Sequence, residues 1–188
     1  MGLLIDPVVS STMLGELPTK PYIYFSYPLI GLAIDERKAL HATAFRLAYF
    51  VRNSCKPWQA YLPHESTDPV SRPEVPQGAI RSTDKAMVEG ARLMVAFLEP
   101  SSAGVAIELE WCVQSQIPVL ACMSSAALDS EFGAQSVSRL VLDTVRATRH
   151  KFFGYGKQPR EGGFMREADE RKLGDAIKQI LSELGASR

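Results

Sequence analysis

The sequence has no excess of either charge, because its 21 lysines and arginines are matched by 21 aspartates and glutamates. Proteins that recruit nucleic acid or an anionic membrane surface through a general electrostatic field need a basic surplus. We therefore expect neither nucleic acid nor a membrane as a partner. Any anionic ligand must be held by a local group of residues.

Long apolar runs and metal-binding motifs are also missing. Asp6, Pro7 and Glu16 interrupt the apolar residues near the start of the chain, and no basic leader precedes them, so neither a signal peptide nor a membrane span is expected. The three cysteines and three histidines lack metal-ligand spacing. We expect a cytoplasmic protein with no metal ion and no other cofactor.

Two common nucleotide-binding signatures are absent as well. No G-x-G-x-x-G motif follows the first expected strand, and no P-loop motif occurs. Dinucleotide binding of the Rossmann kind is therefore not expected. Without internal repeats, the 188 residues predict one globular domain at 21–188, preceded by an N-terminal extension at 1–20 that shows no sustained period.

What the sequence does contain is an alternation of strand-like and helix-like apolar patterns. Strands are expected at 22–29, 58–63, 92–100, 117–123 and, less strongly, 138–145. Helices are expected at 36–53, 82–91, 102–116 and 165–185, and loops at 64–78 and 149–163. Ser82 or Thr83 is the expected cap of the second helix. The order predicts an α/β fold, a single Rossmann-like (flavodoxin-like) domain whose parallel sheet of about five strands is flanked by helices.

In an open parallel sheet, ligands bind at the carboxyl ends of the strands. Four stretches fall there: "SYPLIG", "LPHES", "LEPSSAG" and "CMSSAA". They contribute hydroxyl and imidazole groups such as those of Ser26, His64 and Ser101. Side chains of these kinds suit a polar organic ligand that has both a ring and hydroxyl groups.

The segment "EPSSAGVAIELEW" joins a small-residue turn to an acidic residue. Ser102 and Gly104 fall at the start of a helix, where free backbone N–H groups can bind a phosphate or carboxylate, although a plain helix cap is the simpler interpretation. An ordinary helical glutamate faces solvent, but apolar neighbours favour an inward position for Glu108. Asp84, ahead of the strand at 92–100, is the candidate second carboxylate.

These residues resemble the pattern of the nucleoside 2-deoxyribosyltransferase family, and within it the nucleoside 5-monophosphate N-glycosidases. The resemblance covers residues 22–123 and includes "YIYFSYP" and "LPHE". Its most specific part is an Asp, an apolar strand, and then Pro, Ser, Gly and Glu-Leu. In this chain those positions are Asp84, Leu93 to Leu98, Pro100, Ser102, Gly104, Glu108 and Leu109.

The resemblance implies specific roles. Glu108 would attack the anomeric carbon of a sugar, and Asp84 would protonate the departing base or orient the nucleophile. Tyr24 would lie near the nucleophile or the sugar, Ser102 would hold the phosphate or sugar, and His64 would lie close to the base. The resemblance also implies a homodimer or higher homo-oligomer.

Phosphate recognition departs from the pattern of the phosphate hydrolases in this family. Ile30 stands where those enzymes have an arginine. Ser102 with its helix, Arg37 and Arg81 are the candidates to replace it.

The chemistry agrees with these roles, because breaking a C–N glycosidic bond builds positive charge on the sugar and requires a proton on the departing base. We expect hydrolysis of a nucleoside or nucleoside 5-monophosphate. Base exchange through the same intermediate is one alternative, and a non-catalytic nucleotide-sensing module is another. The presence of both Asp84 and Glu108 argues against the sensing module.

Two remaining features receive plainer interpretations. The basic and aromatic segment at 149–160 fits single-stranded nucleic acid in composition, but a surface or subunit-contact loop is favoured because the net charge is zero. His41 lies in an expected helix, where a histidine on the surface is the default interpretation.

Overall fold

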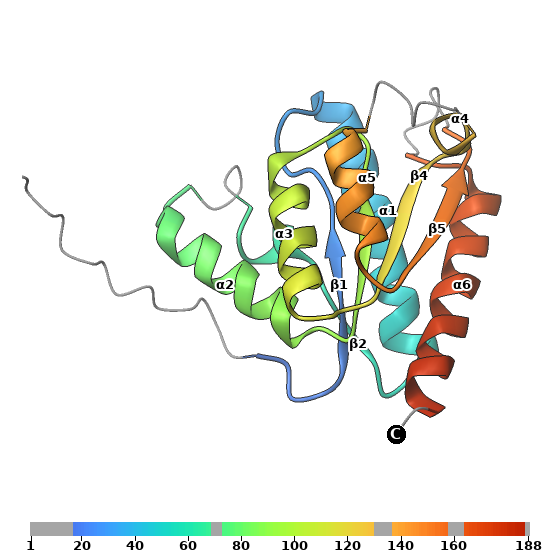
Figure 1. The fold of residues 1–188 in the computed structure, drawn as a ribbon, viewed down its shortest axis with the longest axis horizontal. Helices are drawn as coiled ribbons and strands as arrows, with labels where there is room; N and C mark the ends of the chain where they lie inside the picture. The colour runs from blue at the N-terminus through green and yellow to red at the C-terminus, as the bar shows by residue number, and fades with distance from the viewer. Residues whose placement is uncertain (1–16, 69–72, 130–136, 158–163, 187–188) are drawn as a thin grey trace, which may run out of the picture.

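The structure is a computed structural model that describes residues 17–68, 73–129, 137–157 and 164–186. Most of the expected extension at 1–20 lies outside these residues. Five parallel strands form one sheet in the order β2-β1-β3-β4-β5, which confirms the predicted α/β fold (Figure 1). The strands are β1 (Tyr22–Ser26), β2 (Gln59–Tyr61), β3 (Leu93–Phe97), β4 (Val119–Ser124) and β5 (His150–Tyr155).

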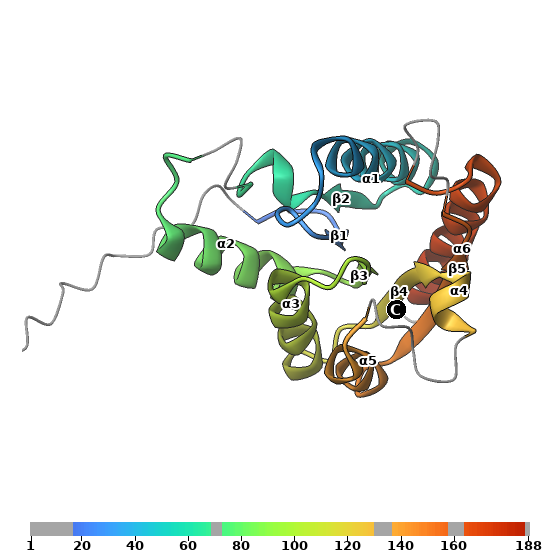
Figure 2. The same ribbon diagram turned by 90° about the horizontal axis from the view of Figure 1, so that it is seen from above.

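Helices cover both faces of this sheet. They are α1 (Ile34–Ser54), the short 3₁₀ helix η1 (Pro63–Glu65), α2 (Gln77–Gly90), α3 (Ala103–Gln114), α4 (Ser125–Leu128), α5 (Arg139–Arg146) and α6 (Glu167–Ala186). Viewed from above, α1 and α6 lie on one side of the sheet, and α2, α3 and α5 lie on the other (Figure 2).

The alternation of side chains along β1 divides the core into two layers. Ile23 and Phe25 pack with the apolar residues of α1 and α6. Tyr22 and Tyr24 pack on the opposite face, with residues of α2, α3 and α5. Because successive side chains of a strand point to opposite faces, Tyr24 is directed to the side of the sheet that α3 covers.

The expected strand at 138–145 is wrong, because this segment is the helix α5. Val141, Leu142 and Val145 are buried, while Leu140 and Asp143 are exposed, which is the spacing of one helix face. A cluster of β-branched and leucine residues on a short helix imitates a strand in composition.

The fifth strand comes from the next segment, which was expected to be a loop. His150–Tyr155 pairs with β4 over six residues. It is an edge strand that is only partly buried, so it tolerates basic residues and Gly154. These residues obscured the apolar pattern by which strands were predicted. The expectation of a surface or subunit-contact loop at 149–160 is therefore wrong for 150–155, and its last three residues lie outside the described part of the chain.

Helix α2 begins earlier than expected, at Gln77, and interrupts the expected loop at 64–78. Pro76 is its N-cap residue, so Ser82 and Thr83 lie inside the helix and do not cap it. Ser82 instead donates a hydrogen bond of 3.1 Å to the carbonyl oxygen of Ala79. This register places Asp84 in the second half of a helix that packs against α3.

None of the helices within the described ranges is long and apolar enough to cross a membrane.

Candidate functional site

Glu108 occupies the inner side of α3 and is held by two hydroxyl groups of β1. Tyr24 Oη donates a hydrogen bond of 2.8 Å to Oε1 of Glu108. Ser26 Oγ donates one of 2.5 Å to Oε2. Tyr24 and Ser26 are two positions apart on a strand, so they face the same side of the sheet. The inward position that the apolar neighbours of Glu108 favoured is therefore correct.

Asp84 approaches from α2 and is almost completely buried, with 9 % of its surface exposed. Thr67 Oγ1 donates a hydrogen bond of 2.9 Å to its Oδ1 atom. Thr67 itself is fully buried and follows η1, so the loop after β2 anchors the second carboxyl group. Thr67 carried no recognisable signal in the sequence.

The two acids are close enough to affect each other. Burial raises the pKa of Glu108 to about 8, and the charge of Asp84 acts in the same direction, while the hydrogen bonds from Ser26 and Tyr24 lower it. Burial raises the pKa of Asp84 to about 6, and the bond from Thr67 opposes this shift. Near neutral pH the pair therefore holds about one proton.

A tyrosine that the sequence analysis did not identify completes this group. Tyr61 on β2 pairs in register with Tyr24, and the two rings stack with centroids 5.4 Å apart. Burial raises the pKa of Tyr24 well above its ordinary value, and the charge of Glu108 reinforces the shift. The Tyr24 hydroxyl therefore stays protonated and remains a hydrogen-bond donor.

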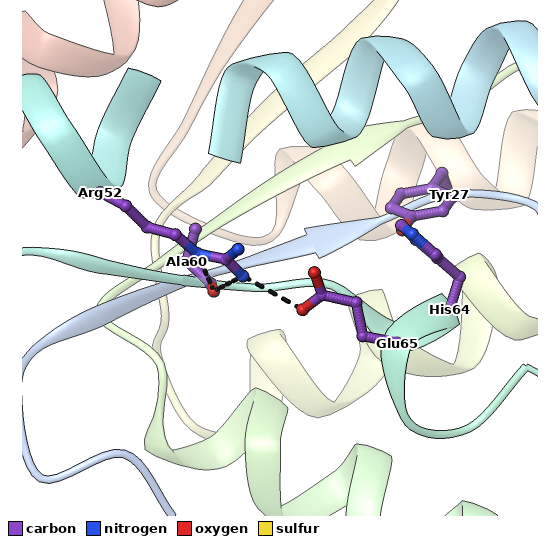
Figure 3. A network of polar contacts seen from close by, with 5 residues as sticks. All are labelled: Tyr27, Arg52, Ala60, His64 and Glu65. Carbon is purple, nitrogen blue, oxygen red and sulfur yellow. Dashed lines mark hydrogen bonds and ion pairs between the residues drawn. The ribbon is translucent and has the colours of Figure 1, made fainter. Parts of the chain in front are cut away.

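His64 lies on η1, beyond the carboxyl end of β2, and its ring faces the end of β1. Its Nδ1 atom shares a short hydrogen bond with the hydroxyl of Tyr27 (Figure 3). Arg52 fixes the position of η1, because it donates a bond of 2.7 Å to the carbonyl of Ala60 and pairs with Glu65 at 3.1 Å (Figure 3). His64 is thus placed at the same edge of the sheet as Ser26.

His41 is packed against this cluster, so the default of a surface histidine is wrong. Its ring stacks on that of His64 with centroids 4.5 Å apart. On α1 it lies three and seven residues before Ala44 and Ala48, which are both buried. That helical spacing was the signal in the sequence that could have placed His41 inward.

The small-residue turn lies ahead of Glu108, as expected. Ser102 is the N-cap residue of α3, but its hydroxyl makes no capping hydrogen bond. A Cβ atom at Gly104 would lie 3.5 Å from Ser102 Oγ. Ser101 Oγ accepts a bond of 3.3 Å from the backbone N–H of Ser138, which ties the turn to the start of α5.

The candidate phosphate ligands differ in how they are placed. Arg37 forms an ion pair with Asp68, a side chain that is only 3 % exposed. Arg81 lies exposed on α2, one turn before Asp84. Within the described ranges, no cluster of three or more His, Cys, Asp or Glu side chains could hold a metal ion.

No protein-family model and no curated protein matches the amino-acid sequence. Solved structures do resemble the fold. A conserved protein from Enterococcus faecalis V583 aligns with a TM-score of 0.56 and 22% identity, over 86% of this chain and 99% of that chain. The CMP N-glycosidase BcmB from Clostridium botulinum aligns with a TM-score of 0.54 and 12% identity, over 85% and 98%. At these identities the similarity establishes a shared fold.

Proposed function

We propose that the protein hydrolyses the N-glycosidic bond of a nucleoside or nucleoside 5-monophosphate through a covalent intermediate on Glu108. The observation that carries the proposal is the pair of hydrogen bonds from Tyr24 and Ser26 to the two oxygens of Glu108. A solvated structural glutamate has no need of two buried hydroxyl donors. The fold shared with a CMP N-glycosidase supports the same chemistry.

With pKa values of about 8 for Glu108 and about 6 for Asp84, the proton of the pair lies mainly on Glu108 in the free protein, and the reactive form is the minor one in which it lies on Asp84. Both oxygens of Glu108 accept hydrogen bonds from hydroxyl groups, an arrangement that suits an ionised carboxylate. Asp84 accepts its bond from Thr67 at Oδ1, which leaves Oδ2 as the position for a proton. In that reactive form the pair supplies a nucleophile, Glu108, and an acid, Asp84.

The first step cleaves the bond to the base. Glu108 attacks the anomeric carbon, and a new C–O bond forms while the C–N bond breaks. The electron pair of the C–N bond goes to the base, and Asp84 delivers its proton to that base. Tyr24 and Ser26 each bind one oxygen of the Glu108 carboxylate, so they hold the group in line for attack and prevent it from rotating.

The second step releases the sugar. A water molecule attacks the anomeric carbon and breaks its bond to Glu108, which leaves as a carboxylate. Asp84, now ionised, accepts the proton of that water and returns to its starting state.

The remaining assignments follow the resemblance in the sequence. Ser102, Ser101 and Gly104 bind the sugar or its phosphate with the free N–H groups at the start of α3, and the uncapped hydroxyl of Ser102 supports this role. His64 contacts the base. The active form is a homodimer or higher homo-oligomer.

A panel of nucleosides and their 5-monophosphates tests the proposal, with free base followed by chromatography. Glu108→Ala abolishes release of the base, whereas Glu110→Ala, an exposed neighbour on the same helix, retains it. Circular dichroism confirms that both variants are folded. A second free base added to the reaction distinguishes hydrolysis from exchange, because exchange yields a new nucleoside and hydrolysis yields free sugar or sugar phosphate.

A further inference from the structure

Three rings from three different segments meet at the carboxyl edge of the sheet. Tyr27 follows β1, His41 lies on α1, and His64 lies on η1. The imidazole rings are nearly parallel, at 18°, with centroids 4.5 Å apart, and the ring of Tyr27 packs edge-on against His41 at 5.6 Å. This geometry is typical of aromatic rings that fix one another in position.

The nitrogen atoms of the two histidines are used differently. His64 binds Tyr27 through Nδ1, and its Nε2 atom has no hydrogen-bond partner in the part of the chain that the structure describes. Nε2 of His41 is buried and also lacks a partner among those residues. His41 therefore contributes its ring face to the cluster.

The charges around the rings cancel. Arg37, one turn before His41 on α1, is paired with Asp68. Arg52, from the end of the same helix, is paired with Glu65. Each of these acids is balanced by an arginine, and two charged rings at 4.5 Å would repel each other strongly in a partly buried site.

The pKa values of both histidines are lowered, mainly because their rings are partly buried. Burial lowers the pKa of His41 to about 4, His64 and Arg37 lower it further, and Asp68 opposes them. Burial is also the main cause that lowers the pKa of His64, while Glu65 and Asp68 raise it and Arg37 and Arg52 lower it. Both rings are neutral at pH 7.

We infer that His41 is a positioning residue whose ring covers and orients that of His64, with Nδ1 on Tyr27 and Nε2 left for the ligand. This inference rests on the proposed function. It implies that His64 makes a neutral hydrogen bond to the base of the substrate and does not act as a cation that binds phosphate. The group of the ligand that faces His64 Nε2 is therefore the edge of an uncharged ring.

Two measurements on three variants test the inference. Nuclear magnetic resonance of the imidazole nitrogens gives the titration midpoint of His64 without any need for turnover, and kcat/KM is followed from pH 5 to 9. His41→Phe keeps a flat ring, so the midpoint and the pH profile stay those of the wild type. His41→Ala removes the ring, so the midpoint rises towards the ordinary value of about 6.5, and kcat/KM at pH 7 falls about tenfold.

His150→Ala is the matched control, because His150 lies at the start of β5, at the opposite end of the strands, where it packs on Phe152. This variant leaves both measurements unchanged. If His41→Ala does not fold, His41→Gln, which lacks the ring but nearly keeps its size, takes its place with the same expected result.

An unchanged His64 midpoint and pH profile in the variant without the ring would overturn the inference. If no variant and no wild-type protein releases base, the proposed function fails, but the midpoint of His64 still decides whether His41 holds that ring neutral.

Discussion

Tyr24 and Glu108 are 84 positions apart in the sequence, and their side chains are joined by a hydrogen bond of 2.8 Å at the carboxyl end of the sheet. The bond connects the first strand to the inner face of α3. It holds in place the carboxylate that we propose as the nucleophile. The role of this bond and of the groups around it can be measured.

Replacing Tyr24 by Phe keeps the stacked ring but removes the donor to Glu108. The pKa of Glu108 then rises further, so less of the ionised nucleophile is present at pH 7. We expect kcat to fall about tenfold to a hundredfold, because a hydrogen bond to a charged group contributes about 1.5–3 kcal/mol. Tyr49→Phe, an exposed tyrosine on α1, is the control. Equal kcat values for the two variants would contradict the role of Tyr24.

Replacing Asp84 by Asn removes the proton donor while the size of the side chain is kept. We expect kcat/KM to fall about 10²- to 10⁴-fold. A substrate whose leaving group departs as a stable anion needs no proton, so its turnover is largely retained. Asp143→Asn, on the exposed side of α5, changes neither rate. If the loss is the same for both kinds of leaving group, Asp84 is not the acid.

The raised pKa of Glu108 also predicts how stability depends on pH. The folded protein keeps the proton of this group up to about pH 8, whereas the unfolded chain releases it near pH 4.5. Stability is therefore lost as the pH rises between these two values. Glu108→Gln has no such loss, so its free energy of unfolding exceeds that of the wild type at pH 8.

We expect the gain to be about 2 kcal/mol, reduced from the full shift because Glu108 is partly exposed, and to vanish at pH 4.5. Urea unfolding at both pH values measures it, with Glu110→Gln as the control. A variant that is no more stable than the wild type at pH 8 would show that Glu108 is ionised at little cost.

Glu99 is a buried acid that stabilises the carboxyl end of β4, and its replacement measures that contribution. It is 2 % exposed, pairs with Lys157 at 3.1 Å and accepts a hydrogen bond from the backbone N–H of Ser124. Glu99→Ala leaves that buried N–H without its acceptor, so we expect a loss of about 2 kcal/mol or more in the free energy of unfolding. Glu183 pairs with Lys151 at the same 3.1 Å on the surface, and Glu183→Ala is expected to cost much less than Glu99→Ala, because an exposed ion pair is screened by solvent. Equal losses would mean that Glu99 is not a support.

The strongly patterned parts of the fold were predictable from the sequence. The apolar runs at 22–29 and 117–123 predicted the strands β1 and β4, and the segment at 102–116 predicted α3, the helix that carries Glu108. The tertiary contacts were not predictable, because the partner of Asp84 is a threonine 17 positions away in a segment expected to be a loop. Local composition does not encode such a contact.

The errors share one physical cause. In α5, β-branched residues form a buried helical stripe, and in β5 the edge position relaxes the need for a fully apolar pattern. In both segments the tertiary context, a buried helix face in α5 and an edge position in β5, overrides local propensity. His41 is a further example of tertiary context overriding local preference. It lies next to the buried stripe of α1, and its ring stacks on that of His64.

The covalent step on Glu108 is the central claim, and mass spectrometry of the acid-quenched reaction tests it most directly. The protein is mixed with a substrate that the base-release assay has identified, quenched within one turnover and digested. We predict that the peptide containing Glu108 gains the mass of the sugar or sugar phosphate, and that Glu108→Ala shows neither this adduct nor base release. Wild-type turnover by Glu108→Ala, or an adduct on another residue, would contradict the account.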